Sequence, residues 1–291
     1  MAAKPKLGQN FLNDPQAAQR IAASLGDLSG RTVVEIGPGA GAITSVLAAR
    51  AAHVVAVELD RGLAAYLRTQ FPPSRITVVE QDVLRFDFAA ALAQYAPTSA
   101  AGQRLLIFGN LPYGITSQIL LKLAASHASL DRAALMVQRE VADRIAAQPG
   151  SRDYGLLSVT VQMYGPAEGL FTLPPQSFSP PPDVHSTVFR WRFAPRFKEL
   201  GLDEAGFLPF VRKAFAHKRK TLLNNLRAAG ISPAAAAGAL ARAGIDPFVR
   251  AEALSIEALA ALWRGLQEDL PEIERAASPS EAALHPETTS G

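Results

Sequence analysis

The chain has 291 residues, no cysteine and a formal net charge of +3 at pH 7. Without cysteine there is no disulfide framework, no thiolate metal site and no cysteine nucleophile, and we predict no metal site. The length allows one large or two moderate domains. No apolar run approaches a membrane span and the N-terminus lacks a signal-peptide pattern, so we expect a soluble cytoplasmic protein.

The first two thirds of the sequence alternate strand and helix patterns. We predict strands at 32–36, 53–58, 76–80, 105–108 and 133–138, and helices at 15–25, 42–49, 60–71, 116–125 and 139–148. Two further strands, at 158–164 and 186–193, would close the sheet. This alternation predicts an α/β fold with a doubly wound, mostly parallel sheet, whose ligands bind at the carboxyl ends of the strands.

A glycine-rich loop follows the first predicted strand. That strand ends on Glu35 and Ile36, and Gly37, Gly39 and Gly41 come next. Glycine allows positive φ and close approach of a ligand to the backbone, which is typical of a nucleotide-binding loop. The third glycine comes one residue earlier than in the dinucleotide fingerprint, and Glu35 suits a cationic amino-acid end better than a pyrophosphate. We therefore predict S-adenosylmethionine rather than NAD as the cofactor.

Acidic residues also end the next two strands. Glu58 ends the second strand, where a carboxylate would bind the cofactor ribose. Asp82 follows the third strand and has two equally good interpretations. It accepts a hydrogen bond from the cofactor adenine, or it caps the next turn.

The tetrapeptide Asn110-Leu111-Pro112-Tyr113 follows the fourth strand. An exocyclic adenine amine is a poor nucleophile because its lone pair is delocalised into the ring. Two acceptors on its N–H bonds, the Asn110 side-chain oxygen and a backbone carbonyl held by Pro112, would localise that lone pair toward an incoming methyl group. Tyr113 would stack on a base swung out of its helix or loop.

A proline-rich segment, 173–182, separates the two closing strands. Prolines favour an extended loop, and we expect it to present one exposed aromatic side chain, Phe178.

The pattern changes at about residue 195. We predict a methyltransferase domain at 1–194, a small all-helical domain at 195–275 with helices at 204–216, 218–229, 233–243 and 256–268, and a disordered tail at 276–291.

The stretch 205–245 contains no Asp or Glu. A solvated helix end accounts for two or three of its basic residues but not for the missing acids, so we predict a phosphate-binding face for RNA. Its proposed RNA-binding residues are Arg212, Lys213, His217, Lys218, Arg219, Lys220 and Arg227.

Taken together, these motifs resemble those of the small-subunit ribosomal RNA adenine N6,N6-dimethyltransferases. The resemblance covers about residues 4–268. It rests on 8–12, 35–41, Glu58, Asp82, 110–113, 178–184, 217–222 and 250–255. His185 departs from the pattern, because an acid is expected there, and the C-terminal tail is longer than the family needs.

The resemblance implies a class I S-adenosylmethionine-dependent methyltransferase fold and a set of site residues. It places Asn10, Leu12, Gly37, Glu58, Asp82 and Asn110 around S-adenosylmethionine. It also implies that Asn110 and the Leu111–Pro112 backbone orient the target amine, while Tyr113 and Phe178 sandwich the base. The implied substrate is a pair of adjacent adenosines in a hairpin loop near the 3′ end of 16S rRNA, within the 30S subunit or its late precursor, and we expect a monomer.

Two alternatives stay open at this point, and a third is disfavoured. A resistance-type methyltransferase of 23S rRNA would share the chemistry. A ribosome-assembly factor would act mainly by binding, although the intact 110–113 motif favours catalysis. A methyltransferase of small molecules would have no use for a basic helical domain.

Overall fold

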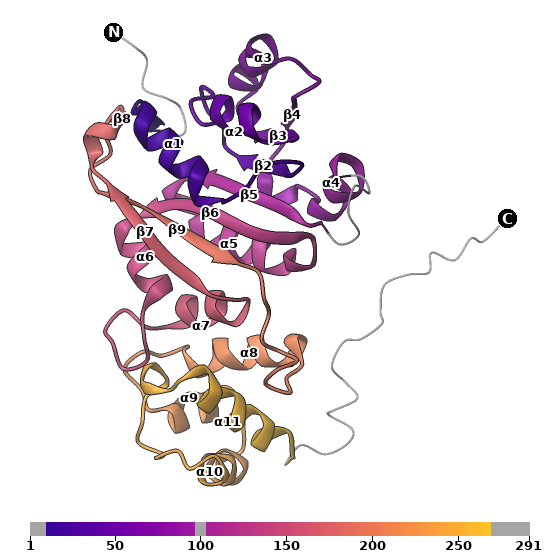
Figure 1. Cartoon of the computed structure of the whole chain (residues 1–291). Helices are drawn as coiled ribbons and strands as arrows, with labels where there is room; N and C mark the ends of the chain where they lie inside the picture. The colour runs from indigo at the N-terminus through magenta and orange to yellow at the C-terminus, as the bar shows by residue number, and fades with distance from the viewer. Residues whose placement is uncertain (1–9, 97–102, 269–291) are drawn as a thin grey trace, which may run out of the picture. The chain divides into compact units, whose positions relative to one another are not determined.

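The computed structural model describes residues 10–96 and 103–268, which form two units (Figure 1). A sheet unit comprises the chain up to Gln148 together with Leu157–Arg196. A helical unit comprises Pro149–Leu156 and the chain from Phe197 onward. Motif residues 8 and 9 and the predicted tail at 276–291 lie outside the described residues.

The sheet unit is built on a seven-stranded mixed sheet with the strand order β4-β3-β2-β5-β6-β9-β7. Neighbouring strands from β4 to β6 are parallel, whereas β9 pairs antiparallel with both β6 and β7. The predicted doubly wound, mostly parallel sheet is therefore confirmed. The strands are β2 (Thr32–Ile36), β3 (His53–Glu58), β4 (Ile76–Glu80), β5 (Leu105–Asn110), β6 (Leu130–Gln138), β7 (Ala167–Leu173) and β9 (Ser186–Arg192).

The central strands are hydrophobic on both faces because helices cover the sheet. Val33, Val34, Leu106 and Ile107 are fully buried, as expected for parallel strands between two layers of helices. The helices of this part of the chain are α1 (Pro15–Ser24), α2 (Thr44–Arg50), α3 (Arg61–Gln70), α4 (Phe88–Tyr95), α5 (Thr116–Ala125), α6 (Arg139–Ala146) and α7 (Leu156–Met163).

Aspartate caps begin three of these helices. Asp14, Asp60 and Asp87 each accept two backbone N–H bonds at the start of α1, α3 and α4. These bonds satisfy amides that have no partner within the helix, which fixes where each helix begins.

The predicted strand at 158–164 is wrong, because this segment belongs to helix α7. Val159 and Val161, which suggested an alternating strand, are buried together with Ser158 and Thr160, so packing overrides the local β preference. The second closing strand is instead β7, which Gly169 and Glu168 made hard to recognise. Helix α4 was also not predicted.

A separate two-stranded sheet brings distant segments together. β1 (Phe11–Leu12) pairs antiparallel with β8 (Phe178–Ser179), and the Cα atoms of Leu12 and Phe178 are direct partners. This pairing joins the start of the chain to the proline-rich segment.

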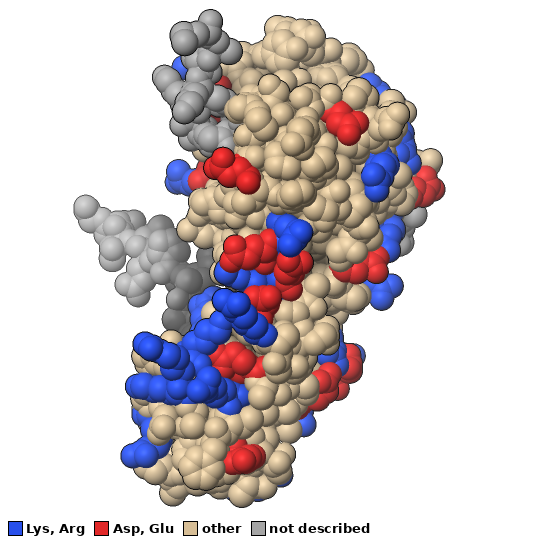
Figure 2. Space-filling view, turned by 90° about the vertical axis from the view of Figure 1, so that its left-hand side faces the viewer, with Lys and Arg blue, Asp and Glu red and all other residues tan. Residues whose placement is uncertain are grey.

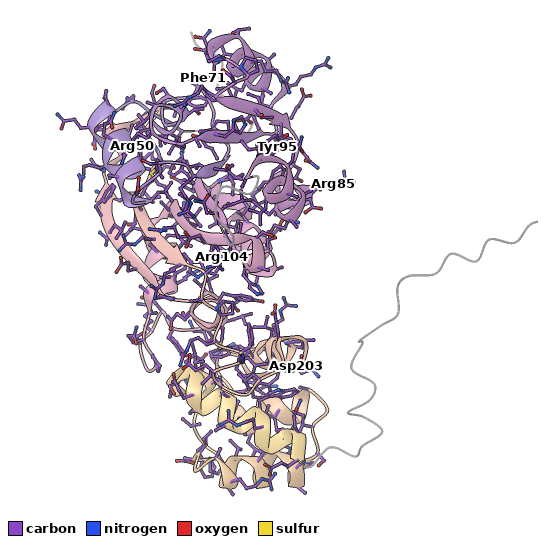
Figure 3. All side chains as sticks on the ribbon, turned by 45° about the vertical axis from the view of Figure 1, so that its right-hand side comes forward. Arg50, Phe71, Arg85, Tyr95, Arg104 and Asp203 are labelled. Carbon is purple, nitrogen blue, oxygen red and sulfur yellow. The ribbon has the colours of Figure 1, made fainter. Side chains whose placement is uncertain are left out.

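The helical unit contains α8 (Glu204–Ala214), α9 (Leu222–Ala228), α10 (Pro233–Arg242) and α11 (Ile256–Glu268). Asp203, labelled in Figure 3, caps α8 through Ala205 N and Gly206 N. Phe207 and Phe210 are buried, and the Phe210 ring lies 5.1 Å from that of Trp263 on α11. In residues 10–96 and 103–268, no helix is long and apolar enough to span a bilayer.

The helix predicted at 218–229 begins later than expected. Residues 218–220 form a turn, and α9 starts at Leu222 because the Thr221 hydroxyl accepts a bond from Asn224 N. The basic residues of this segment therefore lie on a turn, not on a helix.

Candidate active site and basic surface

Four predicted site segments meet at one edge of the sheet. The parallel register aligns Ile36 with Val57 and with Gly109, so the loop after β2, the end of β3 and the end of β5 lie beside one another. The register also pairs Glu58 with Glu80, which brings the loop containing Asp82 to the same edge. This is the carboxyl edge, where open α/β sheets bind ligands.

The glycine loop has the backbone that the sequence predicted. Gly37, Gly39 and Gly41 have φ values of +65°, +58° and +85°. A Cβ atom on Gly37 would have only the carbonyl oxygen of Asn110 within 4 Å, at 4.0 Å. The loop backbone at this glycine is therefore open to close approach by a ligand.

The other two glycines are needed for packing. A Cβ on Gly39 would lie 2.8 Å from Cε1 of Phe11. A Cβ on Gly41 would lie 3.0 Å from the ring of Phe71, which is labelled in Figure 3, and 3.1 Å from Leu67. Phe11 lies outside the predicted cofactor set, and the loop pattern alone carries no signal for this contact.

Glu35 is buried beneath the loop, with 1 % of its surface exposed. Its Oε2 atom has no hydrogen-bond partner among the described residues. Burial raises the pKa of Glu35 to about 8, the Thr44 hydroxyl opposes this rise, and the Glu58 carboxylate adds to it. A buried acceptor without a partner beside an open glycine loop fits the cationic amino-acid end of S-adenosylmethionine, because a cation there would favour the ionised carboxylate.

Glu58 holds the glycine loop in place. Its Oε2 accepts a bond from Gly39 N at 3.1 Å, and its Oε1 accepts one from Asp60 N at 2.9 Å. Each oxygen keeps a further lone pair, so the two ribose hydroxyls predicted at this position can still be accepted. The sequence predicts the role of Glu58 at the ribose but not its role in holding the glycine loop.

Asp82 caps the turn that follows β4. Its Oδ1 accepts a bond from Leu84 N at 2.9 Å, at the start of the 3-10 turn Val83–Arg85. The capping interpretation of Asp82 is thus realised by one oxygen, and Oδ2 has no hydrogen bond among the described residues.

Asn110 is the last residue of β5, and its amide orientation is fixed. Its Nδ2 donates a bond to the carbonyl oxygen of Asn10 at 3.1 Å. A carbonyl only accepts, so the nitrogen must face Asn10, and Oδ1 remains as an acceptor. Asn10 therefore contributes its backbone to this site, and its carbonyl determines which atom Asn110 offers.

The next two residues are fixed by the neighbouring strand and turn. Leu111 N donates to Met136 O at 2.9 Å, and the Leu111 side chain is buried. The Pro112 carbonyl is already bonded to Ile115 N and to the Thr116 hydroxyl. The Leu111 carbonyl accepts no hydrogen bond from any described residue, so it is the backbone acceptor that this segment leaves available.

Two aromatic residues were predicted to face the target base, and they differ in exposure. Tyr113 is 37 % exposed, whereas Phe178 is only 3 % exposed. The predicted exposure of Phe178 is wrong, because β8 pairs with β1 and the ring packs with Leu12 in the hydrophobic core. Leu12 itself is 8 % exposed.

The predicted RNA-binding residues lie in the helical unit, where Lys and Arg side chains gather on one face (Figure 2). The seven residues are exposed. Buried Asn225 shapes their turn, because its Oδ1 accepts from His217 N while its Nδ2 donates to Ala214 O and His217 O. Lys218 Nζ contacts the Arg152 carbonyl at 3.5 Å, so this ammonium group is partly held by the protein.

Comparison with known proteins identifies relatives across the chain. The family model described as "Ribosomal RNA adenine dimethylase" matches residues 1–267. "Ribosomal RNA small subunit methyltransferase A" from Acidobacterium capsulatum is 57% identical over 266 residues, which are 91% of this chain and 92% of that protein.

Two solved structures share the fold. A 23S rRNA methyltransferase, ErmE, is 25% identical with a TM-score of 0.65, over 89% of this chain and 100% of that one. A dimethyladenosine transferase from Plasmodium falciparum has a TM-score of 0.71 at 19% identity, over 89% of this chain and 98% of that one. Both cover parts of the sheet unit and the helical unit.

Proposed function

The chain belongs to the ribosomal RNA adenine dimethylase family, and from this premise we propose that it dimethylates the N6 amines of two adjacent adenosines near the 3′ end of 16S rRNA. The methyl donor is S-adenosylmethionine. The enzyme acts as a cytoplasmic monomer on the 30S subunit or its late precursor. The small-subunit relative at 57% identity supports this substrate over 23S rRNA.

The orientation of Asn110 carries the proposal. Because Nδ2 donates to Asn10 O, the orientation of the amide is fixed and its oxygen is left to accept from a ligand. The carbonyl of the next residue, Leu111, is the second acceptor that has no hydrogen bond among the described residues. An exocyclic amine has two N–H bonds, and these two oxygens match them.

Methyl transfer then follows from how the acceptors polarise the amine. Two hydrogen bonds from the N6 amine to Asn110 Oδ1 and Leu111 O draw the nitrogen toward tetrahedral geometry and localise its lone pair. When bound, S-adenosylmethionine would supply a methyl group on a sulfonium. The nitrogen would bond to the methyl carbon as the carbon–sulfur bond breaks, with the thioether S-adenosylhomocysteine as the leaving group and one proton released from the nitrogen to solvent. A second transfer would give the dimethylamine.

The residues around the glycine loop would hold the cofactor. Glu35 faces its ammonium end, the loop 37–41 its methionine portion, and Glu58 its ribose hydroxyls. The free oxygen of Asp82 accepts from the adenine amine while the other caps the turn. Asn10 and Leu12 close the site from the N-terminal segment.

Tyr113 provides the exposed ring on which the target base stacks. Phe178 is buried, so we assign its contact with the base to the RNA-bound state, in which its ring leaves the packing with Leu12. The basic turn and the neighbouring helices bind RNA phosphates through Arg212, Lys213, His217, Lys218, Arg219, Lys220 and Arg227.

Methylation of isolated ribosomal subunits tests the proposal. Subunits that lack the modification are incubated with enzyme and S-adenosylmethionine, and N6,N6-dimethyladenosine is measured by mass spectrometry. We expect product in 16S rRNA of 30S particles. Asn110→Ala should slow formation by about 100-fold, comparable to removing one preorganised transition-state contact. Gln148→Ala, which changes an exposed amide two residues after the end of α6, is the matched control.

The outcomes separate the alternatives. Product in 23S rRNA of 50S particles would support the activity named for ErmE instead. Wild-type rates for Asn110→Ala would remove Asn110 from the reaction. If an Asn110→Ala strain assembles subunits normally while a deletion strain does not, binding is the essential role in assembly.

A further inference from the structure

The helical unit contains a cavity of about 600 Å³ at the end of α9, which is open to solvent at the surface. It is lined by Lys220, Asn224, Arg227, Ala228, Ile231 and Pro233. This volume lies within the range of small-ligand sites, roughly 300–1,000 Å³. Four of these residues have no part in the RNA-binding set described above.

The two adjacent asparagines of α9 have different roles. Asn225 is 2 % exposed, and three hydrogen bonds occupy its amide. Asn224 is exposed and lines the cavity, and its side chain has no hydrogen bond among the described residues. The Asn225 amide is therefore bonded within the fold, whereas the Asn224 amide lines the cavity with a donor and an acceptor available.

The charge around the cavity is positive. Lys220 and Arg227 line it, and neither forms an ion pair with any described residue. No Asp or Glu occurs in the surrounding stretch 205–245. Two unneutralised cations at one cavity attract a group that carries negative charge.

The remaining lining residues, Ala228, Ile231 and Pro233, are apolar. Gly230, with φ of +86°, ends α9, and Ile231 N then bonds back to Leu226 O at 3.1 Å. Pro233 begins α10 behind the Ser232 cap. Ile231 and Pro233 are thus held beside Ala228 as a surface for a flat or aliphatic group.

We propose that this cavity binds one unstacked nucleotide of the RNA substrate, as an anchor in addition to the adenosine that is methylated. Lys220 and Arg227 bind the phosphate, Ile231 and Pro233 pack against the base or ribose, and Asn224 hydrogen-bonds the edge of the base. This inference rests on the proposed function, because it takes the substrate to be RNA.

The combination of wall types favours a nucleotide over simpler anions. A phosphate ion would use the two cations but not the apolar wall. A duplex would present phosphates but keep its bases stacked. Sequence-specific recognition of RNA relies on bases that are splayed out of single strands and read on their edges.

Equilibrium binding to short RNAs tests the proposal. The full-length protein is titrated, by fluorescence anisotropy at several salt concentrations, with single-stranded decamers of A or U, with an abasic ribose-phosphate decamer, and with a duplex. We expect at least one base-bearing strand to bind about tenfold more tightly than the abasic strand.

Two kinds of variant distinguish base from phosphate contacts. Asn224→Ala should reduce the advantage of the base-bearing strand and leave the salt slope unchanged. Lys220→Ala should lower the slope by about 0.7 log unit, the value for one lost phosphate contact on a single strand. Gln267→Ala, an exposed amide on α11, and Lys198→Ala, an exposed cation of the same unit, are matched controls.

Equal affinity for base-bearing and abasic strands, or tighter binding of the duplex, would overturn the proposal. So would an unchanged base preference in Asn224→Ala. Methylation of 30S particles by the same preparations separates the two hypotheses. An active wild type with no base preference rejects the nucleotide site alone, whereas an inactive wild type rejects the proposed function.

Discussion

Replacing Glu35 with Gln removes a titrating group from beneath the glycine loop while keeping its shape. The pKa of the Glu35 carboxyl is about 8 in the folded protein, against an ordinary value of 4.5. Between these values the folded chain retains a proton that the unfolded chain has released. Because the folded-state pKa of this acid is raised, the stability that Glu35 contributes falls as the pH rises through that window.

One titrating proton changes the free energy of unfolding by at most about 1.4 kcal/mol per pH unit. Between about pH 6 and about pH 7.5, the wild-type free energy of unfolding should therefore fall by up to about 2 kcal/mol relative to Glu35→Gln. Urea unfolding at several pH values measures this difference. All other titrating groups are shared, so subtracting the two curves isolates Glu35. Parallel curves would show that Glu35 does not hold the proton.

Cofactor binding provides a second measurement on the same residue. If the ammonium end of S-adenosylmethionine faces Glu35, binding must release the Glu35 proton below about pH 8. Calorimetry in buffers with different ionisation enthalpies counts that proton. We expect close to one released proton for wild type at neutral pH and none for Glu35→Gln. Equal proton counts would place the ammonium elsewhere.

Two further predictions concern the loop. Glu58→Gln should weaken cofactor binding about tenfold, as measured by calorimetry. Glu58→Ala should weaken it too and should also lower the free energy of unfolding by roughly 1–3 kcal/mol, because Gly39 N and Asp60 N lose their acceptor. Unchanged cofactor affinity in both variants would remove Glu58 from the ribose site. Gly39→Ala should weaken cofactor binding at least tenfold, because the added Cβ would lie 2.8 Å from Phe11. The control Gly30→Ala has a similar φ of +68° but no neighbour within 4 Å, so it should affect stability alone. Equal cofactor affinities in these two variants would contradict the steric reasoning.

The core of the sheet unit was predictable because local pattern and tertiary role agree there. The β-branched residues of β2 and β3 favour strands, and the parallel sheet buries both of their faces. The positions of Glu35, Glu58 and Asn110 at strand ends follow from the same pattern. Their convergence at one edge needs only the rule that parallel strands place their carboxyl ends together.

The failures occur where distant segments decide the outcome. The bond from Asn110 to Asn10 spans 100 residues, and no local pattern indicates it. Phe178 was expected to be exposed among prolines, but pairing with Leu12 buries it. Val159 and Val161 suggested a strand, but residues 158–161 of α7 are all buried, and in a fully buried run helix and strand cannot be distinguished by periodicity.

The chain enters the helical unit briefly at Pro149–Leu156, before the rest of that unit is synthesised, and this has a consequence for the order of folding. Tyr154 in this segment is 1 % exposed, with its ring 6.3 Å from that of Phe215, and Gly150 N bonds to the carbonyl of Glu252, about a hundred residues later. On the ribosome, β7 and β9 are therefore made before Phe215 and Glu252, which contact this segment in the folded protein. A released chain that ends at residue 196 should expose Tyr154 to solvent and protease, whereas a chain that includes α8 and the residues around Glu252 should protect it.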